Sequence, residues 1–219
     1  MEFCFIGEQL GAPQARLNFT HPCNNDPPGG IYLLRKTRMP TSSPSARMRD
    51  ADAVAKAREG EPDGIAAIYE SHAKELYRLI YRLAASPADA EDILHDLFVA
   101  LPELLRRYED RGKLAAWLKQ VATRMTLMRL RAQQRRREVP IDNVATDPAI
   151  AAPPVTNDAF LIEEAMLALP QQQREVFVLR QLEGYSYEEI SELLEISAGA
   201  ARVRYLRALR RIRQRLENS

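Results

Sequence analysis

The sequence predicts an all-α protein made of two small helical domains joined by a flexible linker, the second of which is a helix-turn-helix domain. Its 219 residues are 46% hydrophobic and 28% charged, which is typical of one large folded domain or two small ones. Aromatic residues make up only 7%, and strict apolar–polar alternation bounded by turn residues is not found, which disfavours strands. A proline-rich stretch without helical periodicity separates two segments that have it.

The predicted boundaries follow changes in composition along the chain. Residues 1–47 are rich in Pro, Gly, Ser and Asn and predict a disordered extension. Residues 48–138 form the first helical domain, and residues 158–219 form the second. Between them, residues 139–157 contain four prolines and lack an amphipathic period, so they are expected to form the flexible linker.

Three helices are predicted in the first domain. From Asp63 onward, apolar residues recur at the i, i+3, i+4, i+7 spacing of one buried helix face. A second helix begins with Ser86 as N-cap and Pro87 at its first position, and Pro102 should kink or end it. A third helix should follow Gly112. Its inward-facing residues are expected to be Trp117, Val121, Met125 and Met128.

The second domain should contain four helices. The first begins near Asp158 and is closed by Pro170, and a short second helix follows. Ser186 and Glu189 have the spacing of a capping box at the start of the third helix. Ser197 is the expected N-cap of the last helix. A short helix, a tight turn and a longer helix together make a helix-turn-helix.

The last predicted helix concentrates positive charge. The stretch from Ile196 to Leu216 has seven arginines and no acidic residue, although the formal net charge of the whole chain is only +1. An apolar stripe about 100° wide should pack on the domain core. It consists of Ala201, Tyr205, Ala208, Leu209, Ile212 and Leu216. The arginines occupy the rest of the helix surface.

The exposed arc of this helix suits contact with DNA. Small residues near its start, such as Ala200 and Val203, would let the helix approach the floor of a groove and touch a thymine methyl group. Arginine can grip guanine or phosphate with two hydrogen bonds. A basic face can also simply be solvated, but exposed faces normally mix signs, and this one follows a helix-turn-helix turn. The arginines placed to meet bases and phosphates are Arg202, Arg204 and Arg207.

The third predicted helix of the first domain repeats the basic pattern, with no acidic residue before Glu138. Its basic residues are Lys119, Arg124, Arg129, Arg131, Arg135, Arg136 and Arg137. The linker could extend to roughly 60 Å at about 3.3 Å per residue, or nearly two turns of duplex at about 34 Å each. Two basic helices joined by such a linker could contact one DNA duplex at two separate points. A repressor more often binds as a dimer of identical DNA-binding domains.

The helix that begins at Pro87 has an acidic outer face. Its aligned and flanking residues are Glu91, Asp92, His95, Asp96, Val99 and Glu103. A solvated acidic surface is the ordinary interpretation, and a docking face for a basic protein partner is the alternative. A third interpretation is a helical enzyme that uses Asp92, Asp96 and His95 as acid, base or metal ligands. The sequence has no nucleophile motif, no Gly-rich loop and no metal-ligand spacing to support it.

Catalytic residues, metals and cofactors are not predicted. Cys4 and Cys23, the two cysteines, make no disulfide framework, and together with His21 they are only a weak candidate for a metal or redox site. An apolar run long enough to span a membrane is missing, as is a signal-peptide pattern, so a cytoplasmic location is expected.

These segments resemble bacterial RNA polymerase sigma factors of the extracytoplasmic-function (ECF) group over roughly residues 49–216. The run "YESHAKELYRLIYRLAASPADAEDILHDLFVALPEL" is similar to their core-polymerase-binding segment. "GKLAAWLKQVATRMTLMRLRAQQRR" resembles the segment that opens and reads the −10 promoter element. "LALPQQQREVFVLRQLEGYSYEEISELLEISAGAARVRYLRALRRIRQRL" resembles the −35-reading domain.

The resemblance implies promoter recognition without covalent chemistry. Implied contacts to the −35 element are Ser197, Ala200, Arg202, Val203, Arg204 and Arg207. The family holds the −10 element while its strands separate and a base is flipped out. The implied contacts to the −10 element are Trp117, Lys119, Arg124, Arg129 and Arg131. Those to the clamp helices of core RNA polymerase are Asp92, His95, Asp96 and Val99. The family also implies an anti-sigma partner.

The chain departs from the family pattern at several positions. Members usually have Asn where Arg124 stands, Asp where Met128 stands and Thr where Ala200 stands. The −10 preference therefore cannot be carried over, and one −35 contact is expected to be missing. The 47-residue extension has no counterpart in the minimal pattern. The alternative function is a stand-alone helix-turn-helix regulator, which would need neither the basic helix nor the acidic face of the first domain.

Overall fold

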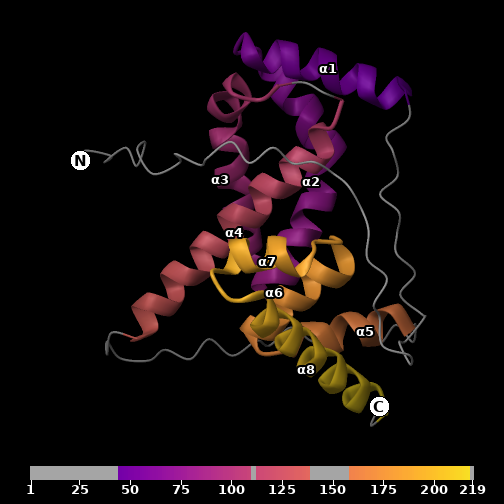
Figure 1. Ribbon diagram of the computed structural model, residues 1–219. Helices are drawn as coiled ribbons and strands as arrows, with labels where there is room; N and C mark the ends of the chain where they lie inside the picture. The colour runs from indigo at the N-terminus through magenta and orange to yellow at the C-terminus, as the bar shows by residue number, and fades with distance from the viewer. Residues whose placement is uncertain (1–43, 110–111, 139–157, 218–219) are drawn as a thin grey trace. The chain divides into compact units, whose positions relative to one another are not determined.

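The computed structural model describes residues 44–109, 112–138 and 158–217, all of which belong to one compact unit, Lys36–Ser219 (Figure 1). The described residues form helices and short connections, without a strand among them. The elements are α1 (Pro44–Arg58), α2 (Pro62–Ala84), α3 (Pro87–Arg106), α4 (Leu114–Glu138), α5 (Asp158–Leu167), α6 (Gln171–Phe177), the π-helical segment η1 (Val178–Leu182), α7 (Tyr187–Leu194) and α8 (Ala198–Glu217). The linker at 139–157 and residues Cys4, His21 and Cys23 lie outside the described residues.

Helices α1–α4 form the first helical group. Figure 1 shows α1 crossing the same end of α2 and α3, and α1 contacts both. Their shared core includes Leu76, Ile80, Leu97, Leu101 and Leu118, each at most 1% exposed. The group therefore closes around the apolar faces that helical periodicity predicted for α2 and α3.

Helix α1 is an element that the sequence did not predict. It begins at Pro44, ahead of the boundary at residue 48, and its Ala53, Val54 and Ala57 are buried. The Arg58 guanidinium at its end donates a hydrogen bond to the carbonyl oxygen of Leu105 at 3.0 Å and another to that of Tyr108. Because mostly alanines carry the packing, α1 lacks the amphipathic pattern that would have revealed it.

Helix α3 corrects one expectation and confirms another. Ser86 is its N-cap, and the Ser86 hydroxyl accepts a hydrogen bond from the amide of Asp89 at 3.2 Å. Pro102 was expected to kink or end the helix. It does not end it, because Pro102 lies inside α3, which continues to Arg106. The reason is packing: Leu101 and Leu105 on either side are fully buried, and this offsets the lost backbone hydrogen bond.

Helix α4 buries a different stripe from the one predicted at its C-terminal half. Leu127 and Leu130 are buried, so Met128 lies on the outer face and is 61% exposed. The prediction that Met128 points inward is therefore wrong. Trp117, Val121 and Met125 are partly buried against the core, as expected.

Helices α5–α8 form the second helical group, in which α5, α6 and α7 each contact α8. The capping box is confirmed: the Ser186 amide donates to Glu189 Oε2 at 2.7 Å, and the Glu189 amide donates to Ser186 Oγ at 3.1 Å. Ser197 caps α8 by accepting a hydrogen bond from the Ala200 amide at 3.1 Å. Helix α5 ends at Leu167, before Pro170 is reached.

Candidate nucleic-acid interface

Helix α8 presents most of its arginines on the surface and one apolar stripe to the core. Ala201, Ala208 and Ile212 are buried, which fixes the orientation of the helix. Arg202, Arg207 and Val203 are exposed, whereas Arg204 is half-buried. The sequence therefore separated the packing face of α8 from its basic face correctly.

The start of α8 is fixed against α7, the other helix of the helix-turn-helix. The Arg202 guanidinium lies 5.2 Å from the centre of the Tyr187 ring, and the Arg180 guanidinium lies 4.8 Å from the same ring. The Tyr205 hydroxyl donates a hydrogen bond of 2.6 Å to Gln181 Oε1. These contacts restrict where α8 can present Arg202, because cation–π contacts favour one placement of the side chain.

Three basic residues of α4 are held in ion pairs, namely Lys119, Arg129 and Arg131. Lys119 Nζ lies 2.7 Å from Glu75 Oε1 and 3.5 Å from Glu183 Oε2, and its side chain is only 12% exposed. Burial lowers the pKa of Lys119, but the hydrogen bonds and charges of these two carboxylates outweigh burial and raise it overall. Lys119 is therefore firmly charged.

Arg129 and Arg131 are engaged as well. Arg129 lies 3.4 Å from Asp92 Oδ2 and 3.8 Å from Asp89 Oδ1. Arg131 Nη1 lies 2.8 Å from Glu195 Oε1, and its Nη2 donates to the carbonyl oxygen of Leu193. Sequence analysis missed these pairings because the partners of Arg131 lie more than 60 residues away along the chain.

The remaining predicted residues of α4 fall into two environments. Trp117 packs against Tyr108, with ring centres 4.7 Å apart, so its indole belongs to the edge of the core. Arg124 is exposed, as is Met128 one turn further along. The surface of α4 thus combines exposed cationic and apolar side chains.

The acidic face of α3 is exposed as predicted. Asp92, His95 and Asp96 are exposed, and Val99 is 66% exposed. Periodicity alone places Tyr69 with the core residues of α2, but half of its surface is exposed, and its ring packs on Phe98 with centres 4.8 Å apart. Val99 on α3 and Tyr69 on the neighbouring α2 are thus large apolar side chains left exposed, which suits contact with a protein more than simple solvation.

Arg174 and Glu175 are buried charges that sequence analysis did not single out. The Arg174 guanidinium donates to the carbonyl oxygens of Leu83, Ala84 and Leu167 at 3.3 Å each and of Leu169 at 2.9 Å. Burial lowers the pKa of Arg174 and raises that of Glu175. Nothing in "QQQREV" signals burial, because the residues that cover this stretch come from distant parts of the chain.

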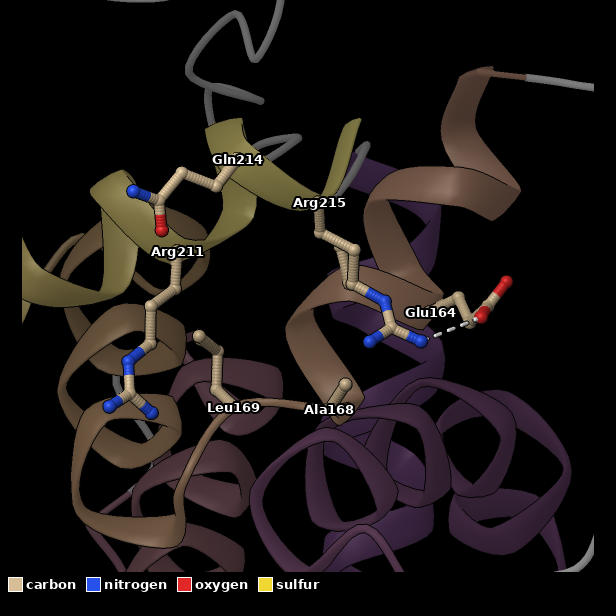
Figure 2. A pocket seen from close by; sticks show the side chains of 7 residues that line it. Glu164, Ala168, Leu169, Arg211, Gln214 and Arg215 are labelled. Atoms are coloured by element: carbon tan, nitrogen blue, oxygen red, sulfur yellow. Dashed lines mark hydrogen bonds and ion pairs between the residues drawn. The ribbon is translucent and has the colours of Figure 1, made fainter. Parts of the chain in front are cut away.

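Two cavities among the described residues are lined largely by charged and polar side chains. The larger, about 530 Å³, lies between α5 and α8. Arg215 Nη2 lies 3.2 Å from Glu164 Oε1 there, and Figure 2 shows this pair together with Arg211, which also projects from α8. The smaller, about 140 Å³, is lined by residues that include Arg131, Glu175 and Arg204. Within the described part of the chain, groups of three or more metal-ligating side chains are not found, nor is a helix long and apolar enough to cross a membrane.

Two family models match the chain, one in each helical group. Sigma-70 region 2 matches residues 68–136, and Sigma-70 region 4 matches residues 159–212. The chain is 30% identical to RNA polymerase sigma factor CarQ of Myxococcus xanthus, over 73% of this chain and 92% of that protein. It is 24% identical to ECF RNA polymerase sigma factor SigW of Bacillus subtilis, over 75% of this chain and 95% of that one.

A solved structure is also similar. It is the sigma factor RpoE in complex with the anti-sigma factor NepR from Bartonella quintana, 24% identical with a TM-score of 0.46, and the match covers 66% of this chain and 91% of that one.

The second helical group contains a helix-turn-helix whose last helix, α8, is basic. These features define an all-α DNA-binding protein. The chain belongs to the ECF group of bacterial RNA polymerase sigma factors, and its function is promoter-specific initiation of transcription. The region 2 match in the first helical group disfavours a stand-alone helix-turn-helix regulator, because such a regulator would need no such region.

Proposed function

We propose that three surfaces of this sigma factor each bind a different target during transcription initiation. Helix α8 reads the −35 element through Ser197, Ala200, Arg202, Val203, Arg204 and Arg207. Helix α4 holds the −10 element through Trp117, Lys119, Arg124, Arg129 and Arg131. The α3 face docks on core polymerase through Asp92, His95, Asp96 and Val99.

The observation that carries the proposal is the separation of charge on the surface. Within α8 the exposed arc is basic, while on α3 the exposed arc combines carboxylates with Val99 and the neighbouring Tyr69. A basic helix suits phosphates and base edges. An acidic and apolar face suits a basic protein surface, because interface cores favour aromatic and aliphatic side chains surrounded by complementary charge.

Docking is tested by gel filtration of the chain with sigma-free core polymerase. Asp92→Arg combined with Asp96→Arg should abolish co-elution, because the two reversed charges repel the basic partner. The matched control is Glu188→Arg with Glu192→Arg, an equal charge reversal at the same i, i+4 spacing on exposed positions of α7. The control should still co-elute. Loss of binding in both variants, or in neither, would move the docking surface elsewhere.

The assignment of α8 is tested by selecting promoter DNA from a randomised −35 region with the reconstituted holoenzyme. Arg202→Ala should relax the preference at one or two adjacent positions, at a cost of about 1–3 kcal/mol of discrimination. The control is Arg210→Ala, more than two turns further along the same helix, which should weaken binding evenly without changing the selected sequence. Identical selected sequences for the Arg202 variant and the unmodified chain would remove Arg202 from base readout.

The remaining expectations of the family also belong to this proposal. The factor works in the cytoplasm, where polymerase and promoters are, and it acts by binding, without covalent chemistry or a cofactor. An anti-sigma protein that covers the α3 face would compete with polymerase for Asp92, Asp96 and Val99. Such competition predicts that the Asp92→Arg, Asp96→Arg variant binds neither protein.

A further inference from the structure

Tyr187, the first residue of α7, has two arginine side chains at its ring. The Arg180 guanidinium, from η1, lies 4.8 Å from the ring centre, and the Arg202 guanidinium, from α8, lies 5.2 Å from it. The ring of Tyr205 in α8 packs edge-on against the same ring, with centres 6.2 Å apart. Three elements of the second helical group, η1, α7 and α8, therefore meet at Tyr187.

The backbone that carries this ring is held on both sides. Gly184 turns the chain between η1 and α7 with a φ of 79°, a left-handed conformation that glycine adopts readily. The Tyr185 amide donates a hydrogen bond of 3.0 Å to the carbonyl oxygen of Leu179. The Arg180 guanidinium donates one of 3.0 Å to the carbonyl oxygen of Tyr185. Because the capping box then starts α7, the ring has a well-defined position.

Arg202 depends on a neighbour for its orientation because its own side chain is exposed. The hydrogen-bond donors of a guanidinium lie in its plane. A guanidinium that lies over the face of an aromatic ring therefore keeps the donors at its edge available. Repulsion between the like charges of Arg180 and Arg202 at one ring restricts Arg202 further. The Tyr187 ring thus favours one direction of the Arg202 donor edge.

Orientation separates the reading of a base from simple attraction to phosphate. A bidentate pair with guanine requires two donors of one guanidinium to meet the O6 and N7 atoms together. Contacts to phosphate oxygens carry no direct sequence information, and a cation attracts phosphate without such alignment. An arginine that loses its support should therefore keep its attraction to DNA and lose part of its preference for one base.

We propose that Tyr187 is a positioning residue for promoter selection, which holds the Arg202 guanidinium in the orientation that two hydrogen bonds to a guanine of the −35 element require. Tyr187 acts through Arg202 and lies on α7, outside the set of residues assigned to DNA contact. The inference rests on the proposed function in assigning Arg202 to the −35 element.

The test selects promoter DNA from a randomised −35 region with the reconstituted holoenzyme. Tyr187→Leu removes the aromatic ring, whereas Tyr187→Phe keeps it, so only the first substitution removes the cation–π contact. Arg202→Ala identifies the positions that Arg202 reads. The matched control is Ile190→Val, which loosens the packing of the same helix at a fully buried residue and leaves the ring in place.

Tyr187→Leu should reduce the preference for guanine about two- to fivefold at the positions that Arg202→Ala affects, the factor that an exposed cation–π contact supports. Its affinity for DNA without a −35 element should be unchanged, because the charge of Arg202 remains. Tyr187→Phe and Ile190→Val should select the same sequence as the unmodified chain.

A measurement without DNA reports on the contact itself. The ring current of Tyr187 should shift the Arg202 Nε–H proton upfield in proton–nitrogen correlation spectra of the full-length chain labelled at its arginines. Arg202→Lys identifies the signal by its disappearance. The upfield shift should be lost in Tyr187→Leu and kept in Tyr187→Phe.

A Tyr187→Leu variant that selects the same sequence as the unmodified chain, or leaves the Arg202 signal unshifted, would overturn the inference, although Arg202→Ala could still support the −35 assignment. An even loss of preference at all positions, or an equal loss in Ile190→Val, would overturn it as well, because Tyr187 would then be purely structural. Unchanged selection by Arg202→Ala would instead contradict the proposed function, and the inference with it.

Discussion

At the residue scale, Arg174 and Glu175 are neighbouring buried charges, and burial disfavours the charged form of each. Arg174 is buried, but carbonyl oxygens receive its donors. Glu175 is also buried and accepts a hydrogen bond of 2.9 Å from Gln171 Nε2, yet burial still raises its pKa above the ordinary value of 4.5. The charged form of Glu175 therefore costs folding free energy. Burial likewise lowers the pKa of Arg174, although carbonyl oxygens accept hydrogen bonds from its guanidinium.

The Glu175→Gln variant should therefore be more stable than the unmodified chain at pH 8, by about 1 kcal/mol. The folded chain holds the Glu175 proton more tightly than the unfolded chain, so this residue lowers stability as pH rises from 4.5 through its raised value. Glutamine removes that dependence while keeping an acceptor for Gln171. Urea unfolding at pH 8 and at pH 5 measures both effects.

The exposed Glu188→Gln variant is the control, and its stability should follow that of the unmodified chain at both pH values. A Glu175→Gln variant that loses stability at pH 8 would mean that the ionised carboxylate is needed by Arg174, Arg131 and Arg204, whose charges lower the Glu175 pKa.

Sequence analysis placed residues well where only local geometry mattered. The exposure of Asp92, Asp96 and Arg202 followed from helical periodicity. The partners of Lys119 and Arg131 did not, because Glu183 and Glu195 come from another helical group and no local pattern reports on them. Met128 was misplaced because the buried stripe of α4 passes through Leu127 and Leu130 instead.

At the scale of elements, the approach of α1 to α2 depends on one glycine. A Cβ atom at Gly64 would clash with the backbone of Ala57 and Ala53. The two helices can approach this closely only because position 64 has no side chain. The Arg58 contacts to the end of α3 then complete the attachment of α1.

Gly64→Ala should lower the free energy of unfolding by about 1–3 kcal/mol, because α1 must shift away from α2. The control is Gly199→Ala in α8, where the added Cβ would meet only Ser197 Oγ at 3.9 Å. That substitution should be neutral or stabilising by up to about 1 kcal/mol, since alanine favours helix more than glycine does. Urea denaturation followed by circular dichroism compares the two, and equal stabilities would show that α1 is loosely attached.

Elements with chemical start signals were predictable, and elements without them were not. Ser86, Ser186 and Ser197 each cap a helix as expected, because a side-chain oxygen at the N-cap is a local requirement. Helix α1 and the π-helical η1 were missed. Neither depends on a residue pattern: α1 is held by packing of small side chains, and η1 is a change in backbone hydrogen bonding within a buried run.

At the scale of the whole molecule, the contact around Arg174 predicts that the two helical groups unfold together. Trp117, the single tryptophan, reports on the first group, whereas circular dichroism reports on both. In low salt, urea transitions by the two methods should coincide. With Glu183→Gln and Glu195→Gln the transitions should separate, because pairs worth up to about 1 kcal/mol each no longer couple the groups. Coincident transitions in that variant would mean that other contacts provide the coupling.

The all-α class and the helix-turn-helix could be predicted because they follow from periodicity and caps. The contact between the helical groups could not, since it depends on single long side chains such as Arg82 and Arg174, which look like ordinary surface residues in sequence. Composition reports how much charge a chain has, whereas its pairing is a property of the folded molecule.

The division of α8 into a core face and an exposed basic face, which we propose contacts DNA, also bears on how such proteins diverge. Ala201, Ala208 and Ile212 anchor the helix, while Arg202 and Val203 are exposed. Under the proposed assignment of α8 to the −35 element, substitutions at the exposed positions alter which promoters are chosen with little effect on folding, because surface changes rarely cost more than about 0.5 kcal/mol. After gene duplication, a copy of this scaffold can therefore acquire a new set of target genes through a few substitutions that leave its stability nearly unchanged.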